Sequence, residues 1–402
     1  FAELLRDRLR AGTPVALAGA LAMRAVAMGH SSFALADAHR LLDALDTHAQ
    51  LPDIDAWSDA LHASDRVATA HGIGHENALL AFENGRIALL RYARYEQDLA
   101  ERLHRRAHAP VRDDAAVADP TFADMLHRLF PRDAVARTHT DLDRQVLAAI
   151  AALRRRLLLI TGGPGTGKTT TVARLLALQV ADAHVRGRAP LRIALAAPTG
   201  RAAARLGEAI DGVLRADLAA GRLDATIADA IPRQARTLHR LLGWQPGRVA
   251  FRHDAKHLLP FDLIVVDEAS MVDLPLMAKL VAAVPADATL VLLGDPDQLP
   301  AVEAGDVLGG LCAASGDGLA LPKTDADVAS ALLGMPVPSC DEDSPLAGSR
   351  VHLLRGWRQT DAEALQTLAL AIQRDDRGAV LARLRSDDPA LTALAHLAGL
   401  WH

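Results

Sequence analysis

Four apolar runs in the middle of the chain have the length and composition of buried β-strands. They lie at residues 157–160, 191–196, 263–266 and 289–293. Short continuous apolar runs of this kind are typical of strands that are buried on both faces. Segments on either side of the first run, at 141–153 and around 172–180, favour helices. The pattern therefore predicts buried strands alternating with helices.

Residues 1 to about 110 have a different pattern and are rich in Ala and Leu. Apolar residues recur there at three- and four-residue spacing, for example at Leu4, Leu5 and Leu9, which predicts a mainly helical region. The region closes with a predicted strand at 86–90. The acidic residues and prolines of 111–131 then indicate a linker.

The first apolar run leads into a glycine-rich loop and then into a helix. Gly162, Gly167, Lys168 and Thr169 fit the spacing G-x-x-x-x-G-K-[ST]. Glycines let backbone N–H groups turn toward phosphate oxygens, and the helix N-terminus adds the positive end of its dipole. A simple glycine-rich turn is the alternative, but the strand before it and the helix after it argue against that. The sequence predicts a nucleoside triphosphate site lined by Gly162, Gly163, Pro164, Gly165, Thr166, Gly167, Lys168, Thr169 and Thr170.

The side chains in and near the phosphate loop have the chemistry that nucleotide hydrolysis requires. Lys168 is expected to reach the β- and γ-phosphates, and the Thr169 hydroxyl is expected to ligate Mg²⁺. Asp267 directly follows a predicted strand and could hold Mg²⁺, while the adjacent Glu268 could polarise the attacking water. Gln298 follows the run at 289–293, where an amide could sense hydrolysis. An acidic turn after a core strand is the alternative for Asp267 and Glu268, which the nearby phosphate loop argues against, whereas Gln298 could equally lie in a solvated turn.

Further polar segments suggest contacts to a nucleic acid and to a base. Thr199 and Arg201 follow the run at 191–196 and could hold a phosphodiester at a helix start. Thr237 and His239 lie in a second polar cluster, RTLHRLLG, although an isolated histidine is more often a packed structural residue. Gln145 could pair with an adenine edge, but one isolated Gln would normally belong to a solvated helix face.

The ordered set of Gln145, GGPGTGKTT, APTGRAA, RTLHRLLG, VVDEASMVD and GDPDQLP resembles the motor of superfamily 1 DNA helicases. Within that group the chain is most similar to the alpha subunit of exodeoxyribonuclease V (RecD). The similarity extends over most of 75–312 and again over 351–360. It implies an α/β fold in which a phosphate-loop NTPase (RecA-like) lobe with a parallel sheet follows a mainly helical N-terminal domain.

The resemblance also implies a role for individual residues. Gln145 would contact adenine, Lys168 and Thr169 would bind phosphates and Mg²⁺, and Asp267 would bind Mg²⁺. Glu268 would be the catalytic base, and Gln298 would couple to the γ-phosphate. Arg358, in a looser match, would reach the γ-phosphate, with an ordinary surface arginine as the alternative. The residues expected along a DNA single strand are Pro198, Thr199, Arg201, Thr237 and His239.

Composition limits the class of protein and its partners. The two cysteines, Cys312 and Cys340, form neither a metal-ligand spacing nor a disulfide framework, which fits a reducing cytosol. No apolar run has the length of a membrane span, so we expect a cytoplasmic protein without a membrane partner. The net charge of −5 requires that any DNA contact comes from a local patch. Aromatic residues make up only 3% of the chain, so Trp244 and Trp357 are either ordinary packing residues or stacking platforms.

The expected domain organisation has four parts. A helical docking domain occupies 1–110, a linker 111–131 and the motor lobe 132–360, while 361–402 begins a further helical region. Within the lobe, 316–349 carries Gly, Pro, Ser and Asp with little periodicity and is expected to be a surface insertion. The chain starts with Phe1 and lacks recognisable motifs of a second motor lobe, so we expect a fragment that binds nucleotide and hydrolyses it slowly.

The function implied is that of an ATP-dependent 5′-to-3′ DNA helicase or translocase subunit, with ATP and Mg²⁺ as cofactors. It would act with the beta and gamma subunits of exodeoxyribonuclease V on single strands and duplex ends in double-strand break repair and recombination. A free-standing superfamily 1 helicase is the main alternative. An ATPase that never unwinds DNA is a further one, which APTGRAAARL and RTLHRLLG argue against. The intact Lys168 and Glu268 argue against a non-enzymatic scaffold.

Overall fold

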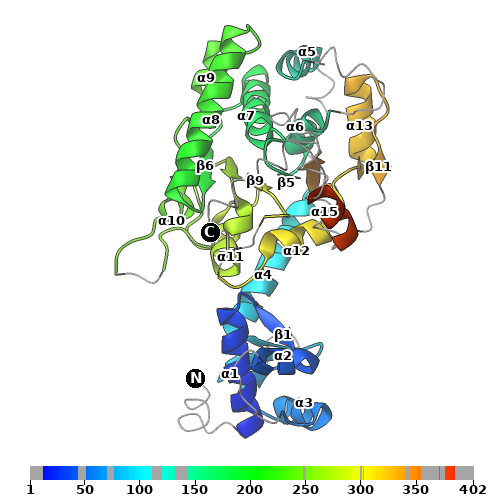
Figure 1. The fold of residues 1–402 in the computed structure, drawn as a ribbon. Coiled ribbons are helices and arrows are strands. Elements are labelled where there is room, and N and C mark those ends of the chain that lie inside the picture. The colour runs from blue at the N-terminus through cyan, green and yellow to red at the C-terminus, as the bar shows by residue number, and fades with distance from the viewer. Residues whose placement is uncertain are drawn as a thin grey trace, which may run out of the picture.

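The structure is a computed structural model, and it describes residues 12–43, 51–69, 77–110, 120–131, 143–247, 250–298, 301, 303–340, 344–354, 371 and 376–384. Figure 1 shows an N-terminal region below a larger lobe, which we call the motor lobe. Among the described residues, no helix is long and apolar enough to cross a membrane.

The N-terminal region combines helices with a small sheet. Its elements are α1 (Thr13–Ala27), β1 (Ser32–Ala34), the 3₁₀ helix η2 (Leu35–Asp37), α2 (Ala38–Asp43), α3 (Ile54–His62), β2 (Val67–Ala68), β3 (Leu80–Glu83), β4 (Arg86–Leu89) and α4 (Leu90–Ala107). The strand order is β1-β4-β3-β2. Asn84 and Gly85, with φ of 50° and 71°, make the tight turn that joins β3 to β4.

This sheet adds short strands to the helices expected in the N-terminal region. The predicted strand at 86–90 is confirmed as β4, except that Leu90 begins α4. The strands β1, β2 and β3 were not predicted, but helices still make up most of the described region, which is mainly helical with a small sheet. The sequence pattern did not indicate these strands because each contains only two to four residues.

The motor lobe is built on a six-stranded sheet. Its elements are α5 (Pro120–Leu129), α6 (Arg144–Arg154), β5 (Leu157–Gly162), α7 (Lys168–Val185), β6 (Ile193–Ala197), α8 (Gly200–Ala219), α9 (Ala225–Asp229), β7 (Arg236–Thr237), α10 (Leu238–Leu241), β8 (Leu263–Val266), the 3₁₀ helix η5 (Ala269–Met271), α11 (Leu274–Ala283), β9 (Thr289–Gly294), α12 (Val307–Ala314), β10 (Leu321–Pro322), α13 (Lys323–Leu333), β11 (Ser339–Cys340) and β12 (Arg350–Leu353), followed by α15 (Arg377–Leu384). The sheet order is β12-β5-β9-β8-β6-β7, and all its pairs are parallel. The four predicted strands are confirmed as β5, β6, β8 and β9, and β12 and β7 are added at the edges.

Both faces of this sheet are covered by helices, as continuous apolar strands require. Successive residues of β5 point to opposite faces: Leu158 and Ile160 pack with α5, α6, α7, α8 and α13. Leu157 and Leu159 join the other core, which includes α4, α11, α12 and side chains of the N-terminal region. The α/β fold with a parallel sheet is therefore confirmed.

The expectation of a surface insertion at 316–349 needs correction. Ala326 and Ala329 of α13 are buried in the core beside α6. Asp325 is fully buried and accepts hydrogen bonds from Arg154 Nε at 2.7 Å and Arg155 Nε at 2.6 Å. Two arginines that follow one another at the end of α6 thus hold the segment against the lobe. The sequence pattern was misleading because glycines and acidic residues flank a short packed helix.

The segment expected to be a linker also contains a packed helix. Within 111–131, α5 buries Phe122, Leu126 and Leu129 in the same core as α7. Helix α5 has only 10 residues, so its apolar pattern is brief, and the surrounding prolines indicated a linker instead. The linker expectation is therefore corrected for 120–129, while 111–119 lies outside the described residues.

Helix α4 joins the N-terminal region to the motor lobe. It packs along α11, and Figure 1 shows it rising from one region into the other. Near its end, the buried Arg106 donates hydrogen bonds to the carbonyl oxygens of Ala288 at 2.5 Å, Pro285 at 2.8 Å and Val284 at 3.1 Å. Burial, with the nearby Arg156 as the second cause, lowers the pKa of Arg106 to about 10. The two regions consequently share one apolar core.

Candidate nucleotide site and nucleic-acid interface

The predicted site residues lie at one edge of the large sheet. Because all six strands are parallel, their carboxyl ends meet at this edge, where α/β proteins bind ligands. The phosphate loop follows β5, Asp267 and Glu268 follow β8, and Gln298 follows β9 by a short turn. Thr199 follows β6 and Thr237 ends β7. Residues from separate parts of the chain are thus brought together.

The phosphate loop depends on its glycines at two points. Gly167 has a φ of 86° where it caps α7, a conformation that favours glycine. A Cβ on Gly162 would lie 2.7 Å from the carbonyl oxygen of Leu353 in β12 and 2.9 Å from Thr166 Oγ1. Gly163, Pro164 and Gly165 continue the loop, and Thr170 lies in the first turn of α7. The loop can follow this path only with small residues at its two ends.

Lys168 is the first residue of α7, and its side chain contacts the preceding loop. Its ammonium group donates hydrogen bonds to the carbonyl oxygens of Gly162 and Gly163, the second at 3.1 Å. Burial lowers its pKa, while the charges of Asp295, Asp267 and Glu268 act in the opposite direction. The lysine therefore lies in the field of carboxylates that follow β9 and β8.

Asp267 and Glu268 occupy an unusual turn after β8. Burial raises the pKa of Asp267 to about 6, although the hydrogen bond from the Glu268 N–H and the charge of Lys168 both lower it. The Glu268 N–H donates to Asp267 Oδ1 at 2.9 Å. Glu268 has a φ of 52°, which is rare for a residue with a Cβ and clusters at functional sites. The backbone here turns Glu268 away from the course of the strand.

Asp295 is a site residue that was not predicted from the sequence. It directly follows β9 and is 2% exposed. Its Oδ1 accepts a hydrogen bond from the Asp297 N–H at 3.1 Å, and its Oδ2 accepts one from Gln298 Nε2 at 3.3 Å. Asp295 thereby orients the side chain of Gln298 at the end of β9. Its position as the first polar residue after a buried strand could have identified it.

Gln145 lies against the phosphate loop from the first turn of α6. Its side chain is buried, and Nε2 donates to the carbonyl oxygen of Thr166 at 3.3 Å. Asp143 caps the helix by accepting a hydrogen bond from the Gln145 N–H at 2.9 Å. Gln145 is therefore not part of a solvated helix face.

A polar chain beneath the loop was also missed. Arg350 Nε donates to Thr161 Oγ1 at 3.0 Å, and the same hydroxyl lies 3.0 Å from His352 Nδ1. Since the arginine can only donate, the Thr161 hydroxyl accepts its hydrogen bond and can itself donate one to His352 Nδ1. Burial lowers the pKa of His352, and the charge of Arg350 adds to this effect. These contacts connect β12 to the last residues of β5, and only the pairing of the strands reveals them.

The predicted nucleic-acid residues lie at the ends of β6 and β7. Thr199 caps α8 through the Ala202 N–H at 3.2 Å, and Thr237 caps α10 through the Arg240 N–H at 3.3 Å. Arg201 and His239 are exposed at these helix starts. Strand pairing of Ala197 with Thr237 brings the two groups side by side, with Pro198 directly after β6. Arg358 lies outside the described residues.

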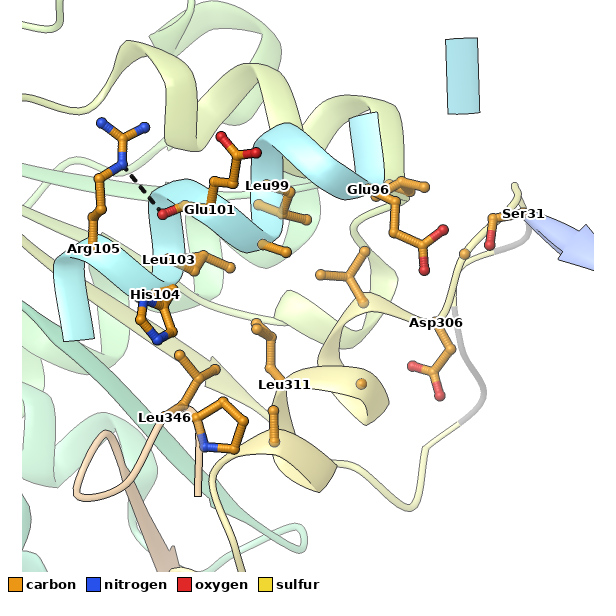
Figure 2. A pocket seen from close by; sticks show the side chains of 17 residues that line it. Ser31, Glu96, Leu99, Glu101, Leu103, His104, Arg105, Asp306, Leu311 and Leu346 are labelled. Carbon is orange, nitrogen blue, oxygen red and sulfur yellow. Dashed lines mark hydrogen bonds between the residues drawn. The ribbon is translucent and has the colours of Figure 1, made fainter. Parts of the chain in front are cut away.

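A large cavity lies elsewhere in the molecule. It has a volume of about 710 Å³ and lies between α4 and α12. Figure 2 shows Leu99, Leu103, Leu311 and Leu346 around it. None of the predicted nucleotide or nucleic-acid residues lines this cavity. It belongs to the junction between the N-terminal region and the motor lobe rather than to the site at the sheet edge.

The parallel sheet and its phosphate loop define a phosphate-loop NTPase lobe, which implies nucleotide binding. Residues 145–304 match a family model described as an AAA domain. The RecBCD enzyme subunit RecD of Mycobacterium tuberculosis (strain CDC 1551 / Oshkosh) is 40% identical over 377 residues, which cover 93% of this chain and 55% of the relative. The corresponding subunit of Mycolicibacterium smegmatis is 40% identical over 343 residues, covering 83% of this chain and 55% of the relative.

A different relative matches a shorter part of the chain. The ATP-dependent RecD2 DNA helicase of Deinococcus radiodurans is 43% identical over 150 residues, which cover 37% of this chain and 17% of the helicase. The resemblance to the RecD subunit, which extends over almost the whole chain, is therefore confirmed. The chain spans about half the length of the RecD subunits that it matches.

Proposed function

We propose that this chain is the nucleotide-hydrolysing part of an ATP-dependent DNA helicase or translocase that moves 5′ to 3′. It would act as the RecD subunit of an exodeoxyribonuclease V complex in double-strand break repair and recombination. The observation that carries the proposal is the convergence of Lys168, Asp267 and Glu268 at one sheet edge, directly beside the ends of β6 and β7. The names of the relatives support the kind of motor.

The oxygen donors at the phosphate loop fit a hard divalent cation. Among the described residues, the Thr169 hydroxyl has no hydrogen-bond partner, whereas Thr171 Oγ1 donates to the Gly167 carbonyl oxygen at 2.9 Å. Asp267 lies close enough to Lys168 for their charges to interact. Thr169 and Asp267 would hold Mg²⁺, which prefers such oxygen ligands and would neutralise phosphate charge.

The other side chains would divide the remaining work on ATP. Lys168 would exchange its loop carbonyls for phosphate oxygens, and Gln145 would face the adenine. Glu268 would accept the proton of the attacking water. Gln298, held by Asp295, would respond to the γ-phosphate, and Arg358 would contact it from the segment after β12.

A DNA single strand would cross the carboxyl ends of β6 and β7. Thr199 and Arg201 would meet its phosphates at the start of α8, a favourable position for an anion. Thr237 and His239 would continue the path at α10, and Pro198 would lie along it. Because such contacts are mainly to phosphate, binding should be insensitive to base sequence and should weaken with salt.

The replacement Glu268→Gln tests the hydrolytic part of this proposal. The amide cannot accept the proton, so we expect DNA-stimulated ATP turnover of the full-length protein to fall by roughly 10²- to 10⁴-fold. ATP–Mg²⁺ binding should persist. The matched control is Glu208→Gln, because Glu208 is exposed on α8. Turnover at the parent rate in Glu268→Gln would assign the base to another residue.

The partner subunits need a separate measurement. The long match to RecBCD enzyme subunits favours beta and gamma partners, and a free-standing superfamily 1 helicase is the alternative. Co-purification of the full-length protein with those two subunits distinguishes the alternatives. A stable ternary complex supports the proposal of a subunit with beta and gamma partners. A full-length protein that unwinds DNA and stays monomeric in their presence favours the free-standing helicase.

The domain organisation and the location in the cell belong to the same proposal. We propose that the part of 1–110 that precedes α4 docks on a neighbouring subunit. Met23, Met28 and Ile54 are large apolar side chains exposed in that part. The division at 132–360 and 361–402 and a cytoplasmic location stay proposals that rest on the resemblance.

A further inference from the structure

Trp244 is exposed to an unusual degree. Its relative exposure of 55% is the highest among the large hydrophobic side chains of the described residues. Trp57, by contrast, is 1% exposed and donates its indole N–H to the Pro14 carbonyl oxygen at 2.9 Å. An indole usually buries a large area when it packs into a core. Core packing therefore does not account for Trp244.

The loop that carries Trp244 is firmly anchored at its base. The Arg252 N–H donates to the Gly243 carbonyl oxygen at 3.2 Å, and the His253 N–H donates to that of Leu242 at 2.9 Å. Phe251, on the returning side, packs against the main core. Lys279 Nζ of α11 lies 5.4 Å from the centre of the Phe251 ring. The loop, which follows α10 in Figure 1, thus holds one aromatic ring inward and presents the other to solvent.

The surroundings of Trp244 are basic although the whole chain is acidic. Among the described residues of 236–258, Asp254 is the single carboxylate, and its side chain accepts hydrogen bonds from the Lys256 N–H at 2.8 Å and the His257 N–H at 2.9 Å. These hydrogen bonds lower the pKa of Asp254, and they direct its carboxylate to backbone N–H groups of its own turn. The exposed cations of this segment are Arg236, Arg240, Arg252 and Lys256. Such a patch complements a polyanion.

Trp244 is also adjacent to the proposed path of the DNA strand. Its backbone N–H donates a hydrogen bond to the His239 carbonyl oxygen at 2.9 Å. The His239 ring is exposed and makes an edge contact with Phe251, with 5.7 Å between the ring centres. Thr237 immediately precedes α10. A strand whose phosphates meet Thr237 and His239 would have its bases within reach of this loop.

We infer that Trp244 is a stacking platform for an unpaired base of a single-stranded nucleic acid. This inference rests on the proposed function and adds a base contact to a path otherwise made of phosphate contacts. Every base has a π face, so the contact tolerates any sequence. The exposed indole and the surrounding cations match the two components of single-strand binding, stacking and backbone attraction. A protein partner seated on Trp244 is the competing occupant.

The test compares two probes that differ only in their bases. One probe is an oligothymidylate, and the other is an abasic phosphodiester chain of the same length. The chain is measured as the parent, as Trp244→Ala, as Trp244→Phe and as Leu258→Ala, because Leu258 is an exposed apolar residue of the same segment. We expect Trp244→Ala to weaken oligothymidylate binding by roughly 5- to 100-fold, with a much smaller loss for Trp244→Phe. Leu258→Ala should match the parent, and no variant should change abasic binding.

The outcomes separate this inference from the proposed function. If the parent binds oligothymidylate and Trp244→Ala binds it equally well, the stacking role is wrong while the DNA path survives. An equal loss on both probes would assign the residue to backbone binding or to the fold and would also overturn stacking. If the parent binds neither probe, the DNA part of the proposed function fails and the inference fails with it. Unchanged DNA binding with lost subunit assembly in Trp244→Ala would identify the protein partner.

Discussion

Asp267 is a position where ligand binding and stability should conflict, and Asp267→Asn exposes that conflict. The side chain ends a strand of the central sheet, and burial raises its pKa from 3.8 to about 6. The asparagine has the same shape and keeps an oxygen that can accept the hydrogen bond of the Glu268 N–H. The replacement therefore removes the charge and leaves the turn in place.

The raised pKa of Asp267 gives both the size and the sign of its effect on the free energy of unfolding. A pKa raised by about two units corresponds to roughly 3 kcal/mol, because one unit is about 1.4 kcal/mol. Asp267 keeps partial contact with solvent, so we expect about 1–3 kcal/mol. The folded state holds the proton more tightly than the unfolded state, so this group stabilises the protein fully below pH 3.8. That stability is lost as the pH rises through about 6. Above pH 6 the parent should thus be less stable than Asp267→Asn, and near pH 4 the two should agree.

The assay is thermal unfolding without nucleotide, across pH 4 to 8, for the parent and Asp267→Asn. All other titrating groups are shared, so the difference in Tm isolates Asp267. We expect a difference of several degrees at pH 7.5 that disappears toward pH 4. Adding ATP and Mg²⁺ should raise the Tm of the parent more than that of the variant, because only the parent keeps the carboxylate proposed to hold Mg²⁺. A variant that is equally stable or less stable at pH 7.5 would refute the reasoning.

Two further predictions concern contacts that hold segments onto the motor lobe. Asp325→Ala should cost about 3–5 kcal/mol, because it leaves Arg154 and Arg155 without their buried carboxylate. A lower Tm measures this loss, and Asp327→Ala, in the same helix, is the control; equal Tm values would contradict it. Arg106→Met should cost about 3 kcal/mol, since three backbone carbonyls lose a charged donor. Urea unfolding measures it, and an unchanged midpoint would show that the contact between α4 and α11 is held by apolar packing alone.

The central strands and the phosphate loop could be predicted because their signals are local. The run at 157–160 and the glycines after it carry the strand, the turn and the helix start within a few residues. The same holds for the carboxylates that directly follow β8. Parallel pairing then brings the strand ends together, so the site at the sheet edge follows once the strands are correct. The chemical roles of these residues stay predictions.

The remaining features depend on contacts between distant residues. The pairing of β12 with β5 joins residues about 190 positions apart, and no local pattern indicates it. The buried Asp325 looks like any acidic residue of a polar segment until Arg154 lies beside it. The positive φ of Glu268 is invisible in composition. The hairpin of β3 and β4, by contrast, has a local signal. Asn84-Gly85 lies between two short apolar runs, and this dipeptide is a strong indicator of a hairpin turn.

Helix α4 decides where the N-terminal region can be separated from the motor lobe. A boundary at residue 110 would remove a helix that packs along α11, together with Arg106, whose hydrogen bonds hold the turn between α11 and β9. Helix α11 follows the turn of Asp267 and Glu268, so such a cut would disturb the nucleotide site through the fold. Loss of partner assembly after that deletion could not be attributed to a missing docking surface. A boundary before Leu90 keeps α4 on the lobe and removes the small sheet and its helices. The docking role of the N-terminal region is therefore a property to be tested on residues before α4, because α4 itself is part of the motor.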